Sequence, residues 1–380
     1  MAFISGYNNR KLAHWVNNNV LDSNYQVTIN PQKTTGSDSG EDVFFGSSVR
    51  DDFDDFRLTK ADESTLLDQW QESLTSGTEA RYWGEIHKVG SSLLTGNASS
   101  AQKDVVVSDA TVFAANDYVI LIDNNGREVC KIASKASNTL TMESNLVNSY
   151  TTAASAKVAH AAYLYYNNSS ATLLSSGDDT FIFFDHFPGV AIDTNKWAGG
   201  TAKVTVASSI ATFTGTSAAW VLCYGKTVKA GNVRARFRAN LPNTSYPWIS
   251  AGYQNQSPSE EVLLYTLTGF NTMKVGVATS LGTDTGGYGA YHLYDFCRLN
   301  SGTATARAFK DNVQTNGGDV TTNVATNDFT CKFGAYGNTT QCLVDWCFLA
   351  NYTYALTWGA WGDEICSLPH TDPYPQLLAQ

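Results

Sequence analysis

Four aspartates in the first quarter of the chain are the first candidates for chemistry. Asp51, Asp52, Asp54 and Asp55 form the densest carboxylate group in the sequence. Calcium takes several oxygen ligands from one loop, with a glycine at the bend and a bidentate glutamate at fixed spacing. Because the group has neither at loop spacing, the pattern favours a solvated turn over a calcium site.

Paired carboxylates for glycoside hydrolysis are not found at the required spacing. Acid and nucleophile must face one groove, which places them at alternate residues of a strand. The sequence has no E-x-D-x-x-E run, and the pair Glu260–Glu261 is adjacent, so a strand would point the two to opposite faces. The one local group suited to lyase chemistry is His292 between Tyr291 and Tyr294, near Arg298. We therefore expect no enzymatic activity.

Aromatic rings in loop-like or strand-end stretches predict a binding surface. An exposed ring stacks on a sugar face while amides and carboxylates bond the hydroxyls. The candidates for such a glycan site are Tyr246, Trp248, Tyr253, Tyr288, Tyr291, His292 and Tyr294, with Trp358 and Trp361 as further rings. The competing interpretation is that half or more of them are core residues, since β-sandwiches routinely bury Trp and Tyr.

Three arginines alternate with apolar residues between residues 233 and 239. Arg234, Arg236 and Arg238 share one face of an extended strand, and the apolar side chains share the other. This pattern predicts a half-buried strand whose arginines face solvent. The alternative is that the three arginines form a ridge that binds anionic glycans.

The composition sets the fold class. A chain of 380 residues suits two or three domains, each large enough to bury a core. Aromatic residues make up 12% and charged residues 16%, with only 3 Met, which favours an all-β protein over a helical bundle. A net charge of −10 and a pI near 5.0 argue against a phosphate-binding surface. We expect no nucleic-acid partner.

Neither a membrane segment nor a zinc site is visible in the sequence. Met1–Arg10 lacks the basic start and apolar run of a secretory signal, and the longest apolar runs are short strands such as Tyr118–Ile122. Seven cysteines occur without a C-x-x-C pair, which argues against zinc. Five of them follow residue 290, where one disulfide competes with the interpretation as buried thiols.

Strand and turn patterns divide the chain. The stretch Phe53–Ser73 predicts an extended segment, a charged turn at Lys60–Ser64 and a second strand from Thr65. Residues 100–157 have a separate series of strand patterns with a hairpin turn at Asp123–Gly126. This series predicts a small β-barrel inserted in a loop of the first domain. After a Ser/Gly/Asp linker at Ala171–Asp179, eight or so strand patterns predict a two-sheet sandwich.

The first part of the chain resembles an uncharacterised β domain found near the start of prokaryotic surface proteins and phage virion proteins. Besides the Phe53–Ser73 pattern, four blocks match in order: Tyr7–Lys11, Tyr25–Ile29, Tyr82–Ile86 and Ala162–Asn168. The inserted segment is similar to small β modules of phage tail and fibre proteins. The resemblance implies a β fold and a surface or virion context, and it carries over no catalytic residue.

The second part resembles a concanavalin-like (laminin G-like) jelly roll. Phe183–Phe187 and Ile192–Trp197 match its opening blocks, and the segments 344–349 and 358–364 match its end. Laminin G-like folds often hold calcium at a loop end. The resemblance therefore implies a calcium site among Asp178, Asp179 and Asp185 near the entrance of this domain.

These patterns together predict an all-β protein with four segments. They are an N-terminal β-sandwich (1–95 and 158–175), an inserted module (100–157), a jelly roll (180–368) and a C-terminal tail (369–380). We expect a non-enzymatic virion protein on the particle surface, such as a capsid decoration, head fibre or tail-associated protein. Its expected partners are other virion proteins and host glycans, a homo-oligomer is left open, and calcium is the one cofactor considered. The alternatives are a secreted or cell-surface adhesin and, less favoured, a polysaccharide-degrading enzyme.

Overall fold

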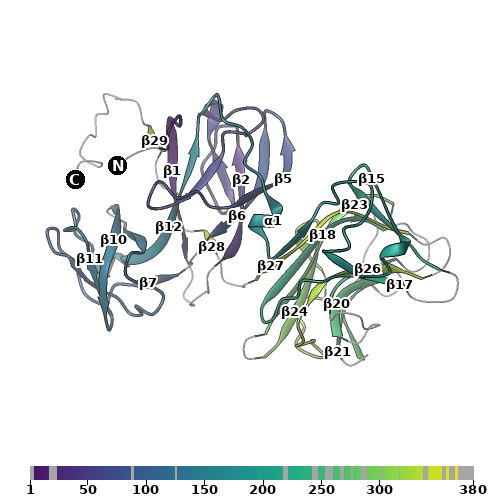
Figure 1. Cartoon of the computed structure of the whole chain (residues 1–380). Coiled ribbons are helices and arrows are strands. Elements are labelled where there is room, and N and C mark those ends of the chain that lie inside the picture. Colours follow the sequence, from purple (N-terminus) through teal and green to yellow (C-terminus); the bar gives the residue numbers. More distant parts are fainter. Residues whose placement is uncertain are drawn as a thin grey trace. The chain divides into compact units, whose positions relative to one another are not determined.

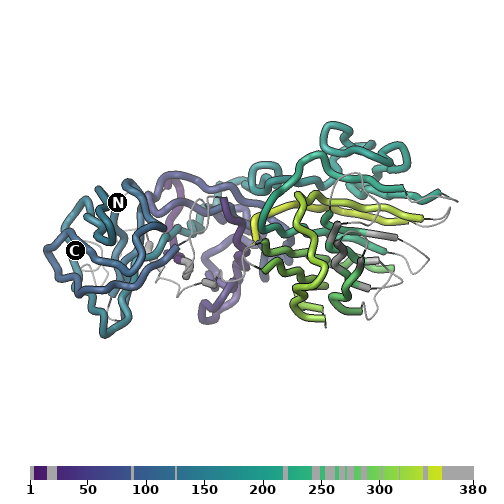
Figure 2. The backbone as a smooth tube through the Cα atoms, turned by 90° about the horizontal axis from the view of Figure 1, so that it is seen from below, coloured from purple at the N-terminus to yellow at the C-terminus, as the bar shows by residue number. Residues whose placement is uncertain are grey.

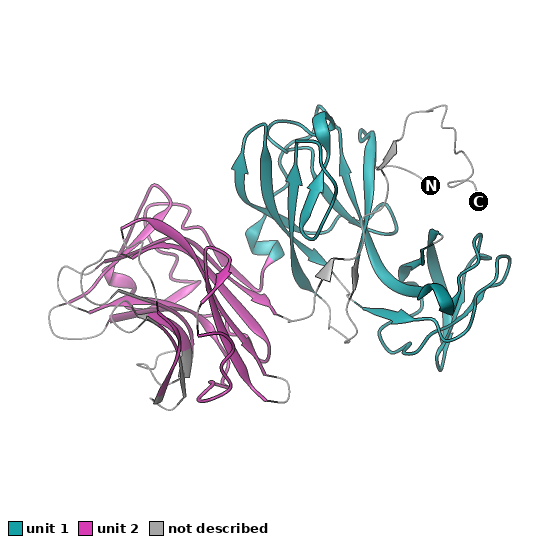
Figure 3. Cartoon of the chain, turned by 180° about the vertical axis from the view of Figure 1, so that it is seen from behind, with its two compact units in different colours: residues 1–180, 354–380 teal, residues 181–353 magenta. Residues whose placement is uncertain are grey.

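The computed structural model shows an all-β protein, which confirms the expected fold class. It describes residues 4–16, 24–86, 90–124, 126–216, 221–241, 247–252, 260–265, 269–274, 277–283, 289–300, 303–315, 317–336, 341–352, 357–358 and 364–366. The chain divides into two compact units, residues 1–180 with 354–380 and residues 181–353 (Figures 1 and 3). In the described segments, no helix has the length and apolar character of a bilayer span.

Unit 1 is built almost entirely of strands. They are β1 (Asn9–Val16), β2 (Tyr25–Gln32), β3 (Asp42–Phe44), β4 (Arg57–Lys60), β5 (Gln69–Thr75), β6 (Glu79–Ile86), β7 (Ser91–Leu93), β8 (Asp104–Val106), β9 (Tyr118–Ile122), β10 (Arg127–Ala136), β11 (Thr139–Met142) and β12 (Lys157–Tyr166). Short 3-10 turns lie at Gly46–Ser48 and Thr152–Ala154, and the helix α1 spans Gly177–Thr180.

The long strand β12 organises unit 1. Its second half pairs with β1 and β4 and packs Leu164 and Tyr166 against a second sheet of order β3-β2-β6-β5. Phe53, Phe56 and Tyr82 fill the core between these two layers and are fully buried. This is the first β-sandwich.

The first half of β12 belongs to a different core. Residues 157–160 pair with β9, and β9 continues into β10, β11 and β8. Their inward side chains, among them Val119, Ile132 and Leu140, form a separate cluster with Val158 of β12. The segment that the sequence set apart at residues 100–157 thus contributes most of this cluster, and β12 joins it to the first sandwich.

The end of the chain returns to unit 1. The strands β28 (Thr357–Trp358) and β29 (Glu364–Cys366) both pair with β1. From the sequence, residues up to 368 were expected in the jelly roll, whereas the second unit ends at Thr353. Of the two blocks that resemble the end of a jelly roll, 344–349 lies in β27 of unit 2, and the described ends of 358–364 pair with β1 of unit 1.

The stretch before β4 differs from the expected extended segment. Residues 51–55 form turns, and Phe53 has a left-handed backbone with φ of 55°. Asp55 is fully buried and accepts hydrogen bonds from the backbone N–H groups of Arg50 and Asn167. The turn at Lys60–Ser64 is present, with Asp62 accepting hydrogen bonds from the N–H groups of Ser64 and Thr65. The second strand, β5, begins at Gln69 and not at Thr65.

Unit 2 contains strands β13 to β27. Their bounds are β13 (Phe183–Asp185), β14 (Trp197–Gly199), β15 (Val204–Ala207), β16 (Ile210–Thr214), β17 (Val221–Gly225), β18 (Val233–Asn240), β19 (Pro247–Gly252), β20 (Glu260–Tyr265), β21 (Gly269–Lys274), β22 (Val277–Gly282), β23 (Tyr291–Leu299), β24 (Thr305–Lys310), β25 (Val313–Gln314), β26 (Thr330–Ala335) and β27 (Gln341–Asn351). A 3-10 turn lies at Thr201–Lys203.

Two antiparallel sheets enclose one core in unit 2 (Figure 2). The larger sheet has the order β15-β16-β27-β18-β23-β24-β25, with β13 also pairing β27, and the smaller has the order β14-β17-β26-β19-β20-β21-β22. Phe237 and Phe296 of the larger sheet meet Phe270 and Phe333 of the smaller in one cluster. Packing of two sheets around one apolar layer is what defines a β-sandwich.

The six cysteines whose side chains are described are free thiols. Cys223, Cys297, Cys331, Cys342 and Cys347 are buried in unit 2 and Cys130 is half-buried in unit 1. Burial raises the pKa of the Cys223 and Cys297 thiols to about 12. Such thiols are neutral apolar groups at neutral pH, as the simpler sequence interpretation proposed.

Candidate functional site

The outer face of the larger sheet of unit 2 carries a row of charged side chains. On β18 the side chains of Val233, Ala235, Phe237 and Ala239 enter the core, as the alternating sequence requires. Arg234, Arg236 and Arg238 consequently lie on the opposite face. The neighbouring strands β23 and β27 place acidic residues on the same face.

Asp295 of β23 holds two of the arginines. Its Oδ1 accepts a hydrogen bond of 2.6 Å from Arg234 Nε, and its Oδ2 accepts one of 2.9 Å from Arg236 Nη1. Arg236 also donates to Asn312 Oδ1 at 2.7 Å. Asp295 and Arg236 are both fully buried. The expectation that the three arginines face solvent is therefore wrong for Arg236, which sits inside a charged network.

A second charged pair lies beside this network on β24. Arg307 donates to Asp319 Oδ2 at 2.5 Å and to the hydroxyl of Tyr352 at 3.2 Å. Burial raises the pKa of Tyr352 well above its ordinary value, so the phenol stays protonated. Each charged side chain on this part of the sheet contacts a group of opposite charge or a hydroxyl.

One accessible part of this face is a group that we call the Tyr291 cluster: Arg238, Asn240, Tyr291 and Asp345. The guanidinium of Arg238 lies 4.8 Å from the centre of the Tyr291 ring and forms an ion pair with Asp345. Asn240 is the register partner of Tyr291 across β18 and β23. The side chains of Arg238 and Asp345 are 44% and 25% exposed, unlike the fully buried Asp295 and Arg236.

The electrostatics of the Tyr291 cluster keep its ring neutral. Burial and the nearby Asp345 carboxylate raise the pKa of Tyr291, and Arg238 lowers it by less. The Tyr291 hydroxyl and Asn240 Oδ1 are buried atoms without a hydrogen-bond partner within the described part of the chain. The cluster thus combines an aromatic ring, a cation, a carboxylate and an amide on three neighbouring strands, β18, β23 and β27.

The aromatic residues predicted to form the glycan site differ in where they lie and in how much of each is described. Tyr246, Tyr253, Tyr288 and Trp361 lie outside the described residues. Trp248 lies on β19 and Trp358 on β28, but only their backbones are described. Tyr291 and His292 are half-buried at the start of β23.

Tyr294 is not an exposed ring. It is fully buried in the core of unit 2, with its ring centre 6.3 Å from that of Phe270. It lies three residues after Tyr291 and therefore faces the opposite side of β23 from that ring, the core side that its register partner Phe237 also faces. The competing interpretation of that residue as core was the correct one. His292 itself binds Asp311 through Nδ1 at 2.7 Å.

Arg298, the fourth member of the lyase-like group, is occupied structurally. It is fully buried, its Nε and Nη2 donate to the carbonyl of Gly231, and its guanidinium stacks 4.0 Å from the Phe329 ring. Arg298 therefore stabilises the backbone at Gly231, and it lies near the opposite end of β23 from Tyr291.

The residues expected to bind calcium are divided between the two units. Asp178 and Asp179 lie in α1 of unit 1, where Asp179 accepts a hydrogen bond from the Ser176 hydroxyl at 2.6 Å. Asp185 lies in β13 of unit 2, where its carboxylate accepts from Trp197 Nε1 at 2.6 Å and from the N–H of Phe187 at 2.7 Å. No group of three His, Cys, Asp or Glu in the described segments could hold a metal ion.

The four aspartates at positions 51, 52, 54 and 55 likewise each contact different groups. Asp51 pairs with Lys33 at 2.5 Å, and Asp52 pairs with Arg50 at 2.6 Å. Asp54 lies 4.0 Å from the same arginine, and Asp55 caps backbone groups as described above. The turn is held by local pairs, as the favoured interpretation of these residues implied.

Two members of the Tyr291 cluster, Asn240 and Asp345, were not singled out as ligand-binding residues from the sequence. Arg238 was considered there only in the alternative of a ridge that binds anionic glycans. Asp345 is 107 residues from Arg238 in the chain, so only strand pairing reveals the contact. The alternating arginines were the one sequence signal for this face.

The fold and the site define a two-unit β-sandwich protein with a polar cluster on an outer sheet face. A family described as "Domain of unknown function (DUF2341)" matches residues 146–200, the segment from the end of the inserted module through β12 to β14. No curated protein matches the chain.

Several solved structures are similar to less than half of the chain. One is β-agarase A in complex with oligoagarose, with 11% identity and a TM-score of 0.35 over 44% of this chain and 90% of that chain. Another is a prokaryotic β-1,3-1,4-glucanase (lichenase) from a mouse hindgut metagenome, with 11% identity and 0.35 over 45% and 99%. A third is the Bacillus licheniformis β-glucanase, with 14% identity and 0.34 over 45% and 98%.

Proposed function

We propose that this chain is a non-enzymatic structural protein on the surface of a virion and that unit 2 binds host glycans through the Tyr291 cluster. The observation that carries the binding role is the half-buried Tyr291 ring with Arg238 at 4.8 Å and Asp345 paired to that arginine. An aromatic ring can stack on the apolar face of a sugar, while charged groups and amides form hydrogen bonds with the sugar hydroxyls.

The contacts of the carboxylates on this face support binding without cleavage. A glycosidase needs two carboxyl groups flanking the bond, one of them protonated. Asp295 lies between two guanidinium groups, and its protonation would leave both positive charges without their shared carboxylate. Asp345 is paired with Arg238. These ion pairs support a role of both carboxylates as counter-charges to arginine.

The virion role rests on the sequence blocks of unit 1. The blocks at residues 7–11 and 162–168 overlap β1 and β12, which pair with each other, and those at 25–29 and 82–86 lie in the paired β2 and β6. The likeness to surface and virion β domains therefore concerns both layers of the first sandwich. A capsid decoration, head fibre or tail-associated position is compatible with this context.

A glycan array tests the binding role. We expect the wild-type chain to bind a subset of glycans, and Tyr291→Ala to lose binding by about tenfold or more, because stacking and the position of Arg238 are both lost. Trp248→Ala tests the other predicted ring. Asp319→Asn, which changes an ion pair on β24, is the matched control and should bind like wild type. An array without signal for the wild type contradicts the binding role.

Immunogold labelling tests the location. Antibodies against the chain should decorate the outside of intact virus particles from the source culture. Gold on the surface of uninfected cells would instead support the adhesin alternative and contradict the virion role, while leaving the glycan site in place.

A further inference from the structure

A cleft of about 230 Å³ lies in unit 1, where β4 ends and β9 begins. Its apolar lining includes Ala61, Ala161 and Leu67. Its described polar lining is formed by Lys60, Asp62, Asn116, Asp117, Tyr118 and His160. None of these residues belongs to the Tyr291 cluster, which lies in unit 2.

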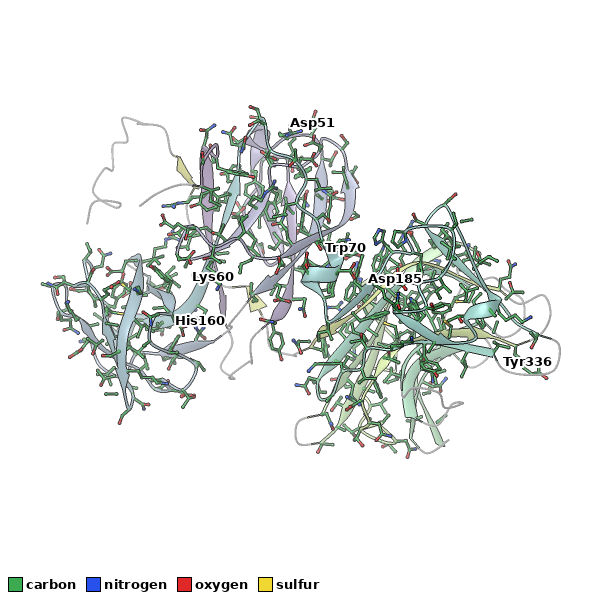
Figure 4. All side chains as sticks on the ribbon, viewed as in Figure 1. Asp51, Lys60, Trp70, His160, Asp185 and Tyr336 are labelled. Atoms are coloured by element: carbon green, nitrogen blue, oxygen red, sulfur yellow. The ribbon has the colours of Figure 1, made fainter. Side chains whose placement is uncertain are left out.

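The cleft follows from the path of β12 through two cores. Lys60, the last residue of β4, is opposite Ala162, and Val119 of β9 is opposite His160. By alternation His160 shares the face of β12 that carries Val158 in one core and Leu164 in the other. His160 therefore lies on β12 between the core that contains Val158 and the core that contains Leu164. Figure 4 shows it near Lys60.

His160 is buried with one unused ring nitrogen. Its side chain is 7% exposed, and its Nε2 lies 3.3 Å from Asp117 Oδ2. The ring packs beside Phe113, with 5.2 Å between ring centres. Nδ1 has no hydrogen-bond partner in the described segments. A buried polar atom without a partner is unfavourable, and a ligand that bonds it removes that cost.

The described lining of the cleft contains the carboxylates of Asp62 and Asp117 and the ammonium of Lys60. Asp62 accepts from the Thr65 hydroxyl and two backbone N–H groups, and Asp117 accepts from the N–H of Ala114. The Lys60 ammonium, by contrast, has no hydrogen-bonded acceptor within the described part of the chain. Among the described residues of the wall, two carboxylates outnumber one ammonium, which does not favour an anion such as phosphate.

We propose that this cleft binds one neutral sugar ring, such as a free monosaccharide or the terminal unit of a glycan. The ammonium of Lys60 and the Asn116 amide donate to hydroxyls, His160 Nδ1 and the carboxylates complete the polar wall, and the alanines face the C–H side of the ring. The volume is below the roughly 300 Å³ at which drug-sized sites begin, which limits the occupant to a single ring.

Ligand-observed saturation-transfer NMR on the full chain tests this site. The probes are free glucose, galactose, mannose and N-acetylglucosamine at millimolar concentration. Lys60→Met keeps the length of the side chain and removes the donor, and it should weaken binding about tenfold. Lys103→Met, which changes an exposed lysine of the inserted module, and Tyr291→Ala in unit 2 should leave this binding unchanged.

A second readout follows the histidine directly. Two-bond proton–nitrogen spectra of the imidazoles should show a shift at His160 Nδ1 when the bound sugar is added, in wild type and in Lys103→Met. The absence of saturation transfer for all four sugars, or equal binding by Lys60→Met and wild type, would overturn the proposal. Because Tyr291→Ala separates the two sites, failure here does not depend on the glycan site of unit 2.

Discussion

At the scale of single residues, the buried carboxylate of Asp295 determines the character of the outer sheet face. Two guanidiniums contact it, and one of them, on Arg236, is fully buried with it. Breaking a buried ion pair costs far more than breaking an exposed one, because a charge is left in a poorly solvated place. The difference in stability between a buried and an exposed ion pair can be measured within this one sheet.

We expect Asp295→Asn to lower the free energy of unfolding of unit 2 by about 3 kcal/mol or more. The matched control is Asp319→Asn, because Asp319 is 41% exposed and its pair with Arg307 should be worth less than about 1 kcal/mol. Urea denaturation followed by tryptophan fluorescence gives both values. Equal losses for the two variants would show that Asp295 is not a structural counter-charge.

Glu85 on β6 makes the stability of unit 1 depend on pH. Burial, with a smaller effect of Asp68, raises its pKa from 4.5 to about 7, although Gln26 donates a hydrogen bond to it. Between these two values the folded state keeps a proton that the unfolded state releases, so stability falls as the pH rises through this window.

The variant Glu85→Gln should remove this dependence. It should be more stable than wild type at pH 8 and equal to it near pH 4.5, since the neutral amide replaces a group that is neutral in the fold at low pH. Urea midpoints at both pH values measure the effect. Glu79→Gln, at an exposed position of the same strand, is the control. A constant difference between variant and wild type at the two pH values would contradict the assignment.

At the scale of elements, β1 depends on strands from the far end of the chain. Asn9–Lys11 pair with β29 on one side and with β12 on the other. Removal of residues 354–380 would expose one edge of β1 and lose several hydrogen bonds, each worth about 0.5–1.5 kcal/mol.

Hydrogen exchange measures this dependence. In a chain that ends at Thr353, the amides of Asn9–Val16 should exchange faster than in the full chain, while those of β18 in unit 2 should be unchanged. Unaltered exchange in β1 would mean that the C-terminal strands add nothing to its protection.

The sequence predicted elements better than contacts. The alternation of residues 233–239 predicted β18 and its core face, because the burial of every second side chain depends only on strand geometry. The network on the other face could not be predicted, since Asp295 and Asn312 are 59 and 76 residues from Arg236. The same reasoning explains why Tyr294 was taken as a ligand-binding ring: its burial depends on Phe270 in the opposite sheet.

At the scale of the whole molecule, the chain consists of units with separate cores. The core of unit 2 draws its residues from 183–349, and the two main cores of unit 1 draw theirs from 13–166. Proteins of this kind unfold in more than one step. The boundaries of these units were only partly visible in the sequence, because the return of β28 and β29 to β1 is a long-range pairing.

Calorimetry should therefore show more than one transition. Phe333→Ala removes a fully buried ring that packs 4.8 Å from Trp197, and it should lower only the transition of unit 2, by about 3–5 kcal/mol. The transition of unit 1 should stay at the same temperature. A single transition that moves as a whole would show that the two units unfold together.

Native mass spectrometry of the chain with the oligosaccharide that it binds best tests the central claim most directly. The account predicts a complex whose added mass equals that of the intact oligosaccharide after prolonged incubation, and a loss of that complex in Tyr291→Ala. Shortened oligosaccharides, or equal occupancy in Tyr291→Ala and wild type, would contradict recognition by the Tyr291 cluster without cleavage.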